Sequence, residues 1–327
     1  MYAVAPAPRA RPALQGRSFL RVAAFSGAEL AALLRLASTL KNGPPTEQRA
    51  LLRSRTVALL FEKPSLRTRV SFEVAVNQLG GETLFAHGSE FMVGSRETPE
   101  DAARVLSRYV DAIVVRTHAH EPLERFAAAA GVPVINGLSA YAHPCQALAD
   151  VLTLHERFGE VAGLQIAYVG DGRNNVAASL AEAVVMLGGT VHFGAPSTHR
   201  PSEAFLAHLL RLGRASGGKA RAFGDAVRAV RGADAVYTDV WTSMGEERYR
   251  EQNEAMLRPY AVTPELLGYA APHAVFMHCL PAHRGEEVDA AVIDGPQSAV
   301  FDQAENRMHA QKALLVALLT DCKGLPR

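Results

Sequence analysis

Short apolar runs alternate with segments of helical periodicity along most of this 327-residue chain. The run TVALLF at 56–61 is continuously apolar and partly β-branched, which is typical of a strand buried on both faces. Strands of this kind are predicted at 56–61, 111–116, 132–135, 164–169, 190–194, 235–239, 274–278 and 298–301. Short buried strands separated by helices favour parallel sheets with helices on both faces, so we predict an α/β, doubly wound fold.

Helical segments lie between these strands. After the first strand, Leu66, Val70, Val74 and Leu79 recur at helical spacing, and Ser65 stands where an N-cap residue belongs. A Gly-Gly pair at 80–81 is a natural end for this helix. Further helices are predicted at 99–109, 123–130, 146–158 and 175–187.

The length of the chain predicts two domains, each with its own core. We expect a first domain at 18–150 and a second at 151–305, joined by the helix after His143, and a C-terminal helix at 306–327 that packs back toward the first domain. Residues 1–17 are expected to form a disordered tail. Their arginines and lack of acidic residues are also typical of a transit peptide, but three prolines interrupt the amphipathic helix that such a leader needs, so we favour the tail.

Composition limits the partners. With 48% hydrophobic and 20% charged residues and a net charge of +1, the chain gives no reason to expect nucleic acid or a membrane surface as a partner. No apolar run reaches the about 18 residues needed to span a bilayer. Cys145, Cys279 and Cys322 form neither a disulfide framework nor a zinc signature, so a reducing compartment, the cytoplasm, is expected.

Polar residues gather directly after the predicted strands, where ligands bind in doubly wound sheets. These clusters are RTH at 116–118, HPCQ at 143–146, GDGRNN at 170–175, DVWTSMG at 239–245, HCLPAHRG at 278–285 and DQAENR at 302–307. A lone histidine or cysteine in such a loop is more often structural than catalytic. Six polar loops at the same end of successive strands instead predict one shared binding site.

The stretch SLRTR at 65–69 places two arginines and two hydroxyls at a helix start. Free N–H groups, the helix dipole and guanidinium groups all favour a bound phosphate there. Taken alone, the stretch fits a capped helix with solvated arginines equally well. The GDG at 170–172 resembles the start of a dinucleotide fingerprint, but the third glycine is missing, so support for an NAD site is weak.

Together, these motifs resemble those of the ornithine carbamoyltransferases, from about residue 19 to about residue 320. SLRTR and HPCQ resemble the carbamoyl-phosphate signature of all carbamoyltransferases, and ENR at 305–307 matches as well. Asp239 with SMG at 243–245, and HCLP at 278–281, are more specific to the ornithine branch. The resemblance implies carbamoyl transfer from carbamoyl phosphate to the δ-amine of L-ornithine, giving L-citrulline and phosphate in arginine biosynthesis. It also implies a homotrimer or a multiple of trimers, with no metal and no other cofactor.

The resemblance further implies a role for each site residue. The phosphate would be held by Ser65, Leu66, Arg67, Thr68 and Arg307. The carbonyl oxygen, where charge grows in a tetrahedral transition state, would be held by Arg116 and His143 together with Thr68. The carbamoyl amide would meet Gln146 and the backbone carbonyl of Leu280, with Cys279 beside them.

Ornithine would be held from the second domain. Its α-amino and α-carboxylate groups would contact Asn175, Ser243 and Met244, while Asp239 and Cys279 orient its δ-amine. That amine has a pKa of about 10.4 in water, like a lysine, so expulsion of water on closure would favour its neutral form. The departing phosphate, and no protein base, would take the proton. The residues expected to be catalytic are Arg116, His143, Asp239 and Cys279.

Two positions depart from the family pattern. Leu66 stands where many relatives have threonine, which removes a hydroxyl but keeps the backbone N–H. Met92 stands where several relatives have a glutamine or histidine that reaches across a subunit contact. Since methionine cannot donate a hydrogen bond, Ser95 or Arg96 is the candidate for that contact, or the contact is absent.

Other functions stay open at this stage. Transfer to aspartate would need basic groups for a second carboxylate, and transfer to acetylornithine or putrescine would alter the SMG loop or the HCLP run. A non-catalytic phosphate- or amino-acid-binding regulator could use the same fold, although it would not need Arg67, Arg116, His143, Arg307, Asp239 and Cys279 together. An NAD-dependent oxidoreductase is disfavoured by the missing glycine.

Overall fold

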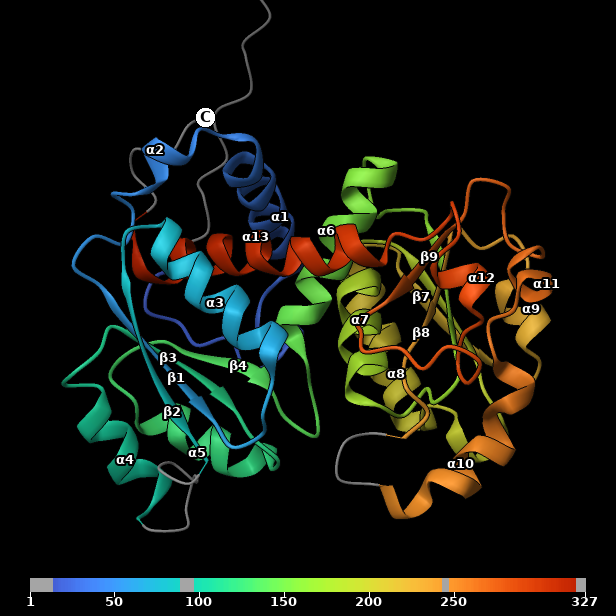
Figure 1. Cartoon of the computed structure of the whole chain (residues 1–327), viewed down its shortest axis with the longest axis horizontal. Coiled ribbons are helices and arrows are strands. Elements are labelled where there is room, and N and C mark those ends of the chain that lie inside the picture. Colours follow the sequence, from blue (N-terminus) through green and yellow to red (C-terminus); the bar gives the residue numbers. More distant parts are fainter. Residues whose placement is uncertain (1–13, 89–96, 243–246, 322–327) are drawn as a thin grey trace, which may run out of the picture.

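Two parallel sheets form the two halves of this computed structural model, which describes residues 14–88, 97–242 and 247–321 (Figure 1). The first sheet has the strand order β2-β1-β3-β4, made of β1 (Thr56–Phe61), β2 (Glu82–His87), β3 (Ala112–Arg116) and β4 (Val134–Leu138). The second has the order β7-β6-β5-β8-β9, made of β5 (Gln165–Val169), β6 (Thr190–Gly194), β7 (Lys219–Phe223), β8 (Ala235–Thr238) and β9 (Val275–His278). All neighbouring strands in both sheets are parallel, which confirms the predicted fold class.

Helices cover both faces of each sheet. They are α1 (Gly27–Asn42), α2 (Pro45–Gln48), α3 (Leu66–Gln78), α4 (Pro99–Leu106), α5 (His120–Ala129), α6 (Pro144–Phe158), α7 (Asn175–Met186), α8 (Glu203–Leu212), α9 (Ala226–Val230), α10 (Arg250–Leu257), α11 (Pro264–Leu267), α12 (Ala290–Ile293) and α13 (Val300–Leu319). Strand β1 shows why two layers of helices are needed. Val57, Leu59 and Phe61 enter one core, whereas Ala58 and Leu60 enter another, because successive side chains point to opposite faces.

One hydrophobic core runs through both halves of the molecule. It includes β1 and β5 side chains together with buried residues of α1, α6 and α13. In Figure 1, α13 (red) lies across the first half and reaches the second sheet near β9, and it packs against α1, α3 and α6. The two sheets are therefore connected by buried helices as well as by the chain between them.

The order of the strands defines where ligands should bind. In the first sheet, β2 lies on the outer side of β1 and β4 lies on the outer side of β3, so the strand order reverses between β1 and β3. In the second sheet, β6 and β7 lie on one side of β5 and β9 lies on the outer side of β8, so the order reverses between β5 and β8. At such switch points the loops leaving the two neighbouring strands diverge and leave a crevice at their carboxyl ends. The residues that follow these four strands are in the clusters predicted from the sequence, which start near Lys63, Arg116, Gly170 and Asp239.

Several details differ from the expectations. Strands 56–61 and 190–194 match β1 and β6. The strands predicted at 111–116, 164–169, 235–239 and 274–278 each differ by one residue at one end, and 132–135 differs from β4 at both ends. The predicted strand 298–301 is wrong, because α13 begins at Val300 and only Ser298 forms an isolated bridge, to Phe276. Strands β2 and β7 were missed; both lie at sheet edges, and their partly exposed, polar-containing sequences lack the continuous apolar pattern of a central strand.

The predicted apolar face of α3 is also wrong in part. Leu66 is 78% exposed and Val70 44% exposed, while Thr68, Phe72, Ala75 and Val76 are buried. The helix therefore turns a different stripe toward the core. At the N-terminus, Leu14 is buried and the Gly16 N–H donates to the Leu318 carbonyl at 2.9 Å, so residues 14–17 are packed rather than part of a tail. No helix in the described ranges is long and apolar enough to cross a membrane.

Candidate active site

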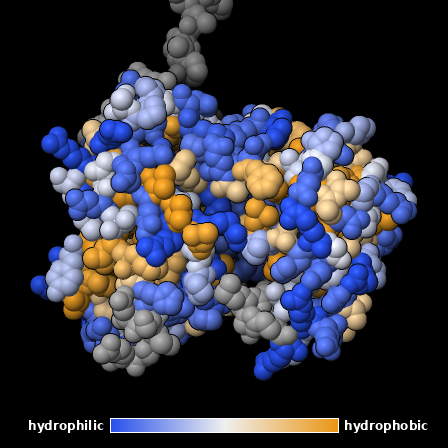
Figure 2. Space-filling model, in the orientation of Figure 1, coloured by the Kyte–Doolittle hydropathy of each residue, from blue (hydrophilic) through white to orange (hydrophobic). Residues whose placement is uncertain are grey.

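A cavity of about 1300 Å³ lies between the two sheets, and Figure 2 shows the surface hollowed between the two halves. Its walls come from the loops after β1, β3, β4, β5, β8 and β9 and from α13. The predicted site residues that line it are Ser65, Leu66, Arg67, Thr68, Arg116, His143, Asn175, Asp239, Cys279, Leu280 and Arg307. The structure thus brings together residues separated by up to about 240 positions in the chain.

The first turn of α3 forms one wall. Ser65 is its N-cap: the Ser65 hydroxyl accepts from the Thr68 N–H at 3.3 Å and lies 3.0 Å from the Thr68 hydroxyl. The first N–H groups of a helix have no partner within the helix, so those of Leu66 and Arg67 are available to a ligand. This wall supplies N–H groups, hydroxyls and the positive end of the helix dipole, which suits an anion.

Three guanidinium groups converge on the same region. Burial first, and then the charges of Arg307 and Arg67, lower the pKa of Arg116 to about 10. Burial also lowers the pKa of Arg307, and Arg67 adds to the effect. Arg116 Nε and Arg307 Nε have no hydrogen-bond partner among the described residues. Three like charges held together, two of them on buried side chains, favour an anionic ligand because such a ligand relieves their repulsion.

His143 lies next to these arginines and is almost fully buried. Burial and the positive charges of Arg307, Arg116 and Arg67 hold its pKa well below the ordinary range, so the imidazole is neutral at physiological pH. Its Nδ1 has no hydrogen-bond partner among the described residues. A neutral imidazole in this position can donate one hydrogen bond to a ligand oxygen without adding a fourth positive charge.

Arg307 is fixed from two sides. Its Nη1 donates to Gln146 Oε1 at 2.9 Å and its Nη2 donates to the Thr68 hydroxyl at 2.7 Å. Gln146 is buried and does not line the cavity, and its Nε2 donates to Asp150 at 2.8 Å. Gln146 therefore lies behind the cavity wall in this structure, where it holds Arg307, and both of its amide atoms are engaged by the protein.

Leu280, in the loop after β9, lines the cavity. Leu280 has a φ of +57°, a left-handed conformation that costs about 1–2 kcal/mol for a residue with a side chain. Its N–H donates to His278 Nδ1 at 2.9 Å, which helps to hold this conformation. His278 is buried, and its Nε2 lies 3.4 Å from Glu287 Oε1. The backbone at Leu280 is thus held in place by a buried pair behind it.

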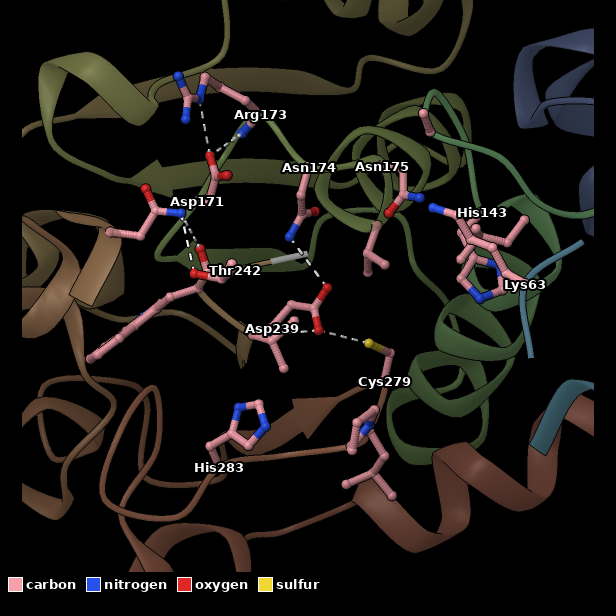
Figure 3. A pocket seen from close by; sticks show the side chains of 18 of the residues that line it. Lys63, His143, Asp171, Arg173, Asn174, Asn175, Asp239, Thr242, Cys279 and His283 are labelled. Carbon is pink, nitrogen blue, oxygen red and sulfur yellow. Dashed lines mark hydrogen bonds and ion pairs between the residues drawn. The ribbon is translucent and has the colours of Figure 1, made fainter. Parts of the chain in front are cut away.

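Asp239 and Cys279 meet at the second-sheet wall, as Figure 3 shows. The Cys279 thiol donates to Asp239 Oδ1 at 3.0 Å, and Asn174 Nδ2 donates to Asp239 Oδ2 at 3.2 Å. Burial raises the pKa of Asp239, and burial together with the neighbouring Asp239 charge raises the pKa of the Cys279 thiol well above its ordinary range. The thiol therefore stays protonated at neutral pH and acts as a donor to the carboxylate.

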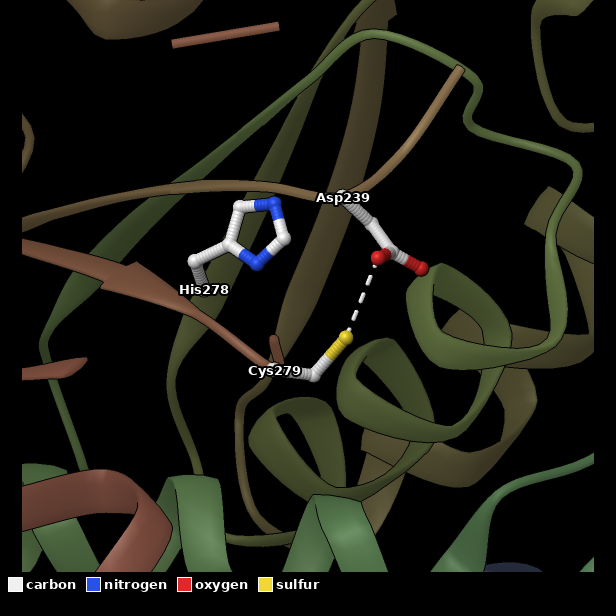
Figure 4. Close-up of side chains that lie close together, drawn as sticks. All are labelled: Asp239, His278 and Cys279. Atoms are coloured by element: carbon white, nitrogen blue, oxygen red, sulfur yellow. Dashed lines mark hydrogen bonds between the residues drawn. The ribbon is translucent and has the colours of Figure 1, made fainter. Parts of the chain in front are cut away.

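Two groups of side chains have the residue types that bind metal ions. Asp239, His278 and Cys279 each have a ligand atom within 4.8 Å of the others (Figure 4), as do His283, Glu286 and Glu287. In the first group the thiol donates to Asp239, and both His278 nitrogens have neighbours, the Leu280 N–H and Glu287. A metal there would have to displace these contacts and the thiol proton.

Some predicted residues cannot be placed, and others were missed. Ser243, Met244, Met92, Ser95 and Arg96 lie outside the described residues. Asn175 lines the cavity, and its Nδ2 donates to the Ser139 carbonyl at 2.6 Å. Cavity-lining residues to which no role was assigned from the sequence include Lys63, His118, Asp171, Arg173, Asn174, His199, Trp241, Asn253 and His283. Asp171 and Asn174 belong to the GDGRNN cluster, so a signal existed for them; His199 and Asn253 lie outside every cluster.

Similarity to known proteins extends over most of the chain. Residues 17–156 match the model of the aspartate/ornithine carbamoyltransferase carbamoyl-P binding domain, and residues 162–318 match that of the Asp/Orn binding domain. An ornithine carbamoyltransferase of Parafrankia sp. is 49% identical over 310 residues, which cover 94% of this chain and 98% of the relative. The solved ornithine carbamoyltransferase from Pyrococcus furiosus matches with a TM-score of 0.90 and 46% identity, covering 95% of this chain and 99% of that one. A structure from Thermus thermophilus with the same name matches with a TM-score of 0.83 and 43% identity over 93% of this chain and 99% of that one.

Proposed function

This chain belongs to the aspartate/ornithine carbamoyltransferase family, and on that premise we propose that it transfers the carbamoyl group of carbamoyl phosphate to the δ-amine of L-ornithine, giving L-citrulline and phosphate. The observation that carries this proposal is the convergence of Arg67, Arg116 and Arg307 at the start of α3, opposite Asp239 and Cys279 in the same cavity. One wall of the cavity suits a phosphate and the other suits an amine.

We assign the phosphate of the first substrate to the start of α3. Ser65, Leu66, Arg67 and Thr68 supply hydroxyls, N–H groups and a guanidinium, and Arg307 closes the anion pocket. Arg116 and neutral His143 hold the carbamoyl oxygen, where negative charge grows as the amine attacks. The Leu280 carbonyl accepts from the carbamoyl amide. Gln146 acts by holding Arg307.

We assign the δ-amine of ornithine to Asp239 and Cys279 and its α-groups to Asn175, Ser243 and Met244. Asp239 already accepts from Cys279 and Asn174, so its direction is set before the amine arrives. The raised pKa of Cys279 argues against a thiolate base at neutral pH. The amine therefore attacks in its neutral form and passes its proton to the departing phosphate, whose oxygen becomes basic as its bond to the carbamoyl carbon breaks.

A colour assay for citrulline tests this assignment. The purified protein should form product from carbamoyl phosphate and L-ornithine, and none from aspartate, putrescine or N-acetylornithine at equal concentration. Product from one of these other amines would reassign the substrate. Binding of carbamoyl phosphate without turnover of any amine would support a regulator instead.

The organisation of the chain is also proposed here. We propose a carbamoyl-phosphate-binding domain at 18–150 and an ornithine-binding domain at 151–305, with the C-terminal helix returning to the first. The packing of α13 against α1, α3 and α6 supports the last point, although that helix begins at Val300, six residues before the expected start at 306. Free Cys145 and Cys279 fit the proposed cytoplasmic location.

We further propose a homotrimer. Exposed apolar side chains on α3 and β2 support it: Leu66, Val70 and Leu84 are 78%, 44% and 51% exposed, and Figure 2 shows apolar surface on the half of the molecule that carries these elements. Light scattering after size exclusion should give three times the chain mass. A Leu84→Lys variant should shift the protein toward monomer, and a monomeric wild-type protein would contradict the proposal.

A further inference from the structure

A buried carboxylate lies behind the cavity wall, at the junction of the two halves. Asp150 on α6 is completely buried and does not line the cavity. Gln146 Nε2 and Gln303 Nε2 both donate to its Oδ1, at 2.8 and 2.7 Å, and the Tyr237 hydroxyl lies 3.3 Å from its Oδ2. These three partners come from α6, α13 and β8, so one side chain connects the first domain, the C-terminal helix and the second sheet.

Each glutamine uses its other amide atom to hold a part of the candidate site. Gln146 Oε1 accepts from Arg307 Nη1 at 2.9 Å, in the anion pocket. Gln303 Oε1 accepts from the backbone N–H of His278 at 2.9 Å, at the end of β9 just before Cys279 and Leu280. Through these two amides, hydrogen bonds connect the Asp150 carboxylate to Arg307 on one wall of the cavity and to the backbone before Cys279 and Leu280 on the opposite wall.

The polarity of an amide is set by what its neighbours can accept or donate. An ionised carboxylate can only accept, so it requires the NH₂ end of each glutamine and leaves the carbonyl end for the opposite neighbour. Arg307 and the His278 N–H can only donate, so they require those carbonyl ends. If either glutamine were reversed, its NH₂ group would face another donor, and a buried donor without a partner is costly.

We infer that Asp150 is a positioning residue for the reaction, because it fixes the orientation of Gln146 and Gln303. Gln146 then holds Arg307 in the anion pocket, and Gln303 holds the backbone at His278, which leads to Leu280. This inference rests on the proposed function, because it assigns Arg307 to the phosphate and Leu280 to the carbamoyl amide. Burial raises the pKa of Asp150 to about 7, with its hydrogen-bond donors and Arg307 acting in the opposite direction. Burying the ionised Asp150 carboxylate costs free energy, so its presence is better explained by a positioning role than by a contribution to stability.

The test compares four variants by calorimetric binding of inorganic phosphate and by steady-state kinetics with carbamoyl phosphate and ornithine at pH 8.5, where Asp150 is ionised. Gln146→Met should weaken phosphate binding about tenfold and Gln303→Met should lower kcat about tenfold with phosphate binding unchanged, since each loses one hydrogen bond to the site. Asp150→Leu should show both effects. A leucine offers no acceptor, so both glutamine amides lose the contact to Asp150 Oδ1 that sets their orientation.

Tyr237→Phe is the matched control. It removes a contact to the same carboxylate and the 3.0 Å bond from Gln303 Nε2 to the Tyr237 hydroxyl, but it leaves both glutamine amides bonded to Asp150. Phosphate binding and kcat should therefore stay within about twofold of wild type even if the protein unfolds more readily. Urea unfolding of all four variants separates loss of stability from loss of positioning.

The outcomes are distinct. Asp150→Leu with wild-type phosphate affinity and kcat would overturn the inference, and so would Tyr237→Phe with losses as large as those of Asp150→Leu. If Asp150→Leu does not fold, the separate effects of Gln146→Met on phosphate and of Gln303→Met on kcat decide. If the wild-type protein makes no citrulline, the proposed function is contradicted, and the calorimetric measurement of phosphate binding still tests the role of Asp150.

Discussion

Arg67 is the exposed member of the three arginines that converge on the start of α3; Arg116 and Arg307 are 7% and 4% exposed. On the sequence it could be a solvated helix residue, and its place on the cavity wall is what favours a phosphate contact. A guanidinium can bind phosphate through two parallel hydrogen bonds, which an ammonium cannot imitate.

We therefore predict that Arg67→Lys lowers kcat/KM for carbamoyl phosphate by about 10²-fold, the loss of a bidentate charged contact. Its circular dichroism and unfolding midpoint should stay unchanged. The matched control is Arg69→Lys on the same helix, because Arg69 pairs with Glu73 at 2.9 Å and does not line the cavity. Equal kinetics in the two variants would remove Arg67 from the phosphate site.

The second residue-scale prediction concerns Cys279 and Asp239. Since the pKa of the thiol is raised well above its ordinary range, the thiol remains protonated through neutral pH and cannot accept the amine proton there. The alkaline rise in turnover should come from the δ-amine losing its proton, with an apparent pKa below the free value of about 10.4 because the site excludes water.

We expect Cys279→Ser and Asp239→Asn to lower kcat and raise the KM for ornithine while the ascending limb of the pH profile survives. A rate loss of about 10²-fold can follow from misplacement alone, so its size decides nothing. The deciding measurement is kcat/KM for ornithine between pH 6 and pH 10. Loss of the ascending limb in Cys279→Ser would make the thiol a general base.

At the scale of elements, the start of α3 has two functions that can be separated. The Ser65 hydroxyl caps the helix and also lies at the cavity. The same cap occurs at α8, where the Ser202 hydroxyl accepts from the Phe205 N–H at 3.2 Å and Ser202 does not line the cavity.

We predict that Ser65→Ala and Ser202→Ala each lower the free energy of unfolding by about 1 kcal/mol, the usual contribution of an N-cap. Only Ser65→Ala should also weaken carbamoyl-phosphate binding, by about tenfold for one charge-assisted hydrogen bond. Urea denaturation gives the first quantity and calorimetry the second. If both variants bind the ligand like wild type, Ser65 is a cap and nothing more.

For the whole molecule, the prediction is an order of substrate binding. The residues proposed to bind carbamoyl phosphate belong to β3 and to the N-terminal region of α3, together with α13, while Asp239 follows β8 and Asn175 begins α7. Carbamoyl phosphate should neutralise the three guanidiniums and draw the walls together, and only then is the ornithine site complete.

Product-inhibition patterns should show carbamoyl phosphate binding first and phosphate leaving last. Calorimetry with ornithine alone should give binding at least about tenfold weaker than in the presence of an unreactive carbamoyl-phosphate analogue. Equal affinity in both conditions would rule out the ordered scheme.

The sequence by itself determined the features that depend on local chemistry. Short runs rich in apolar or β-branched residues located β1 and β6 and most of the central strands, and the N-cap position of Ser65 was correct. The motifs at 65–69, 143–146 and 278–281 identified the family, because chemically distinctive residues at short spacings can be recognised in a sequence without knowledge of the fold.

Only the tertiary structure decided the features that depend on what packs nearby. Edge strands β2 and β7 have too few buried positions for an apolar pattern, and they form strands because they pair with β1 and β6. Which stripe of α3 faces the core was decided by α13 and β2. Gln146 lies between Asp150 and Arg307 and forms a hydrogen bond to each. Asp150 and its partner Gln303 are 153 positions apart, and no local pattern predicts that a buried carboxylate will meet two amides from different helices.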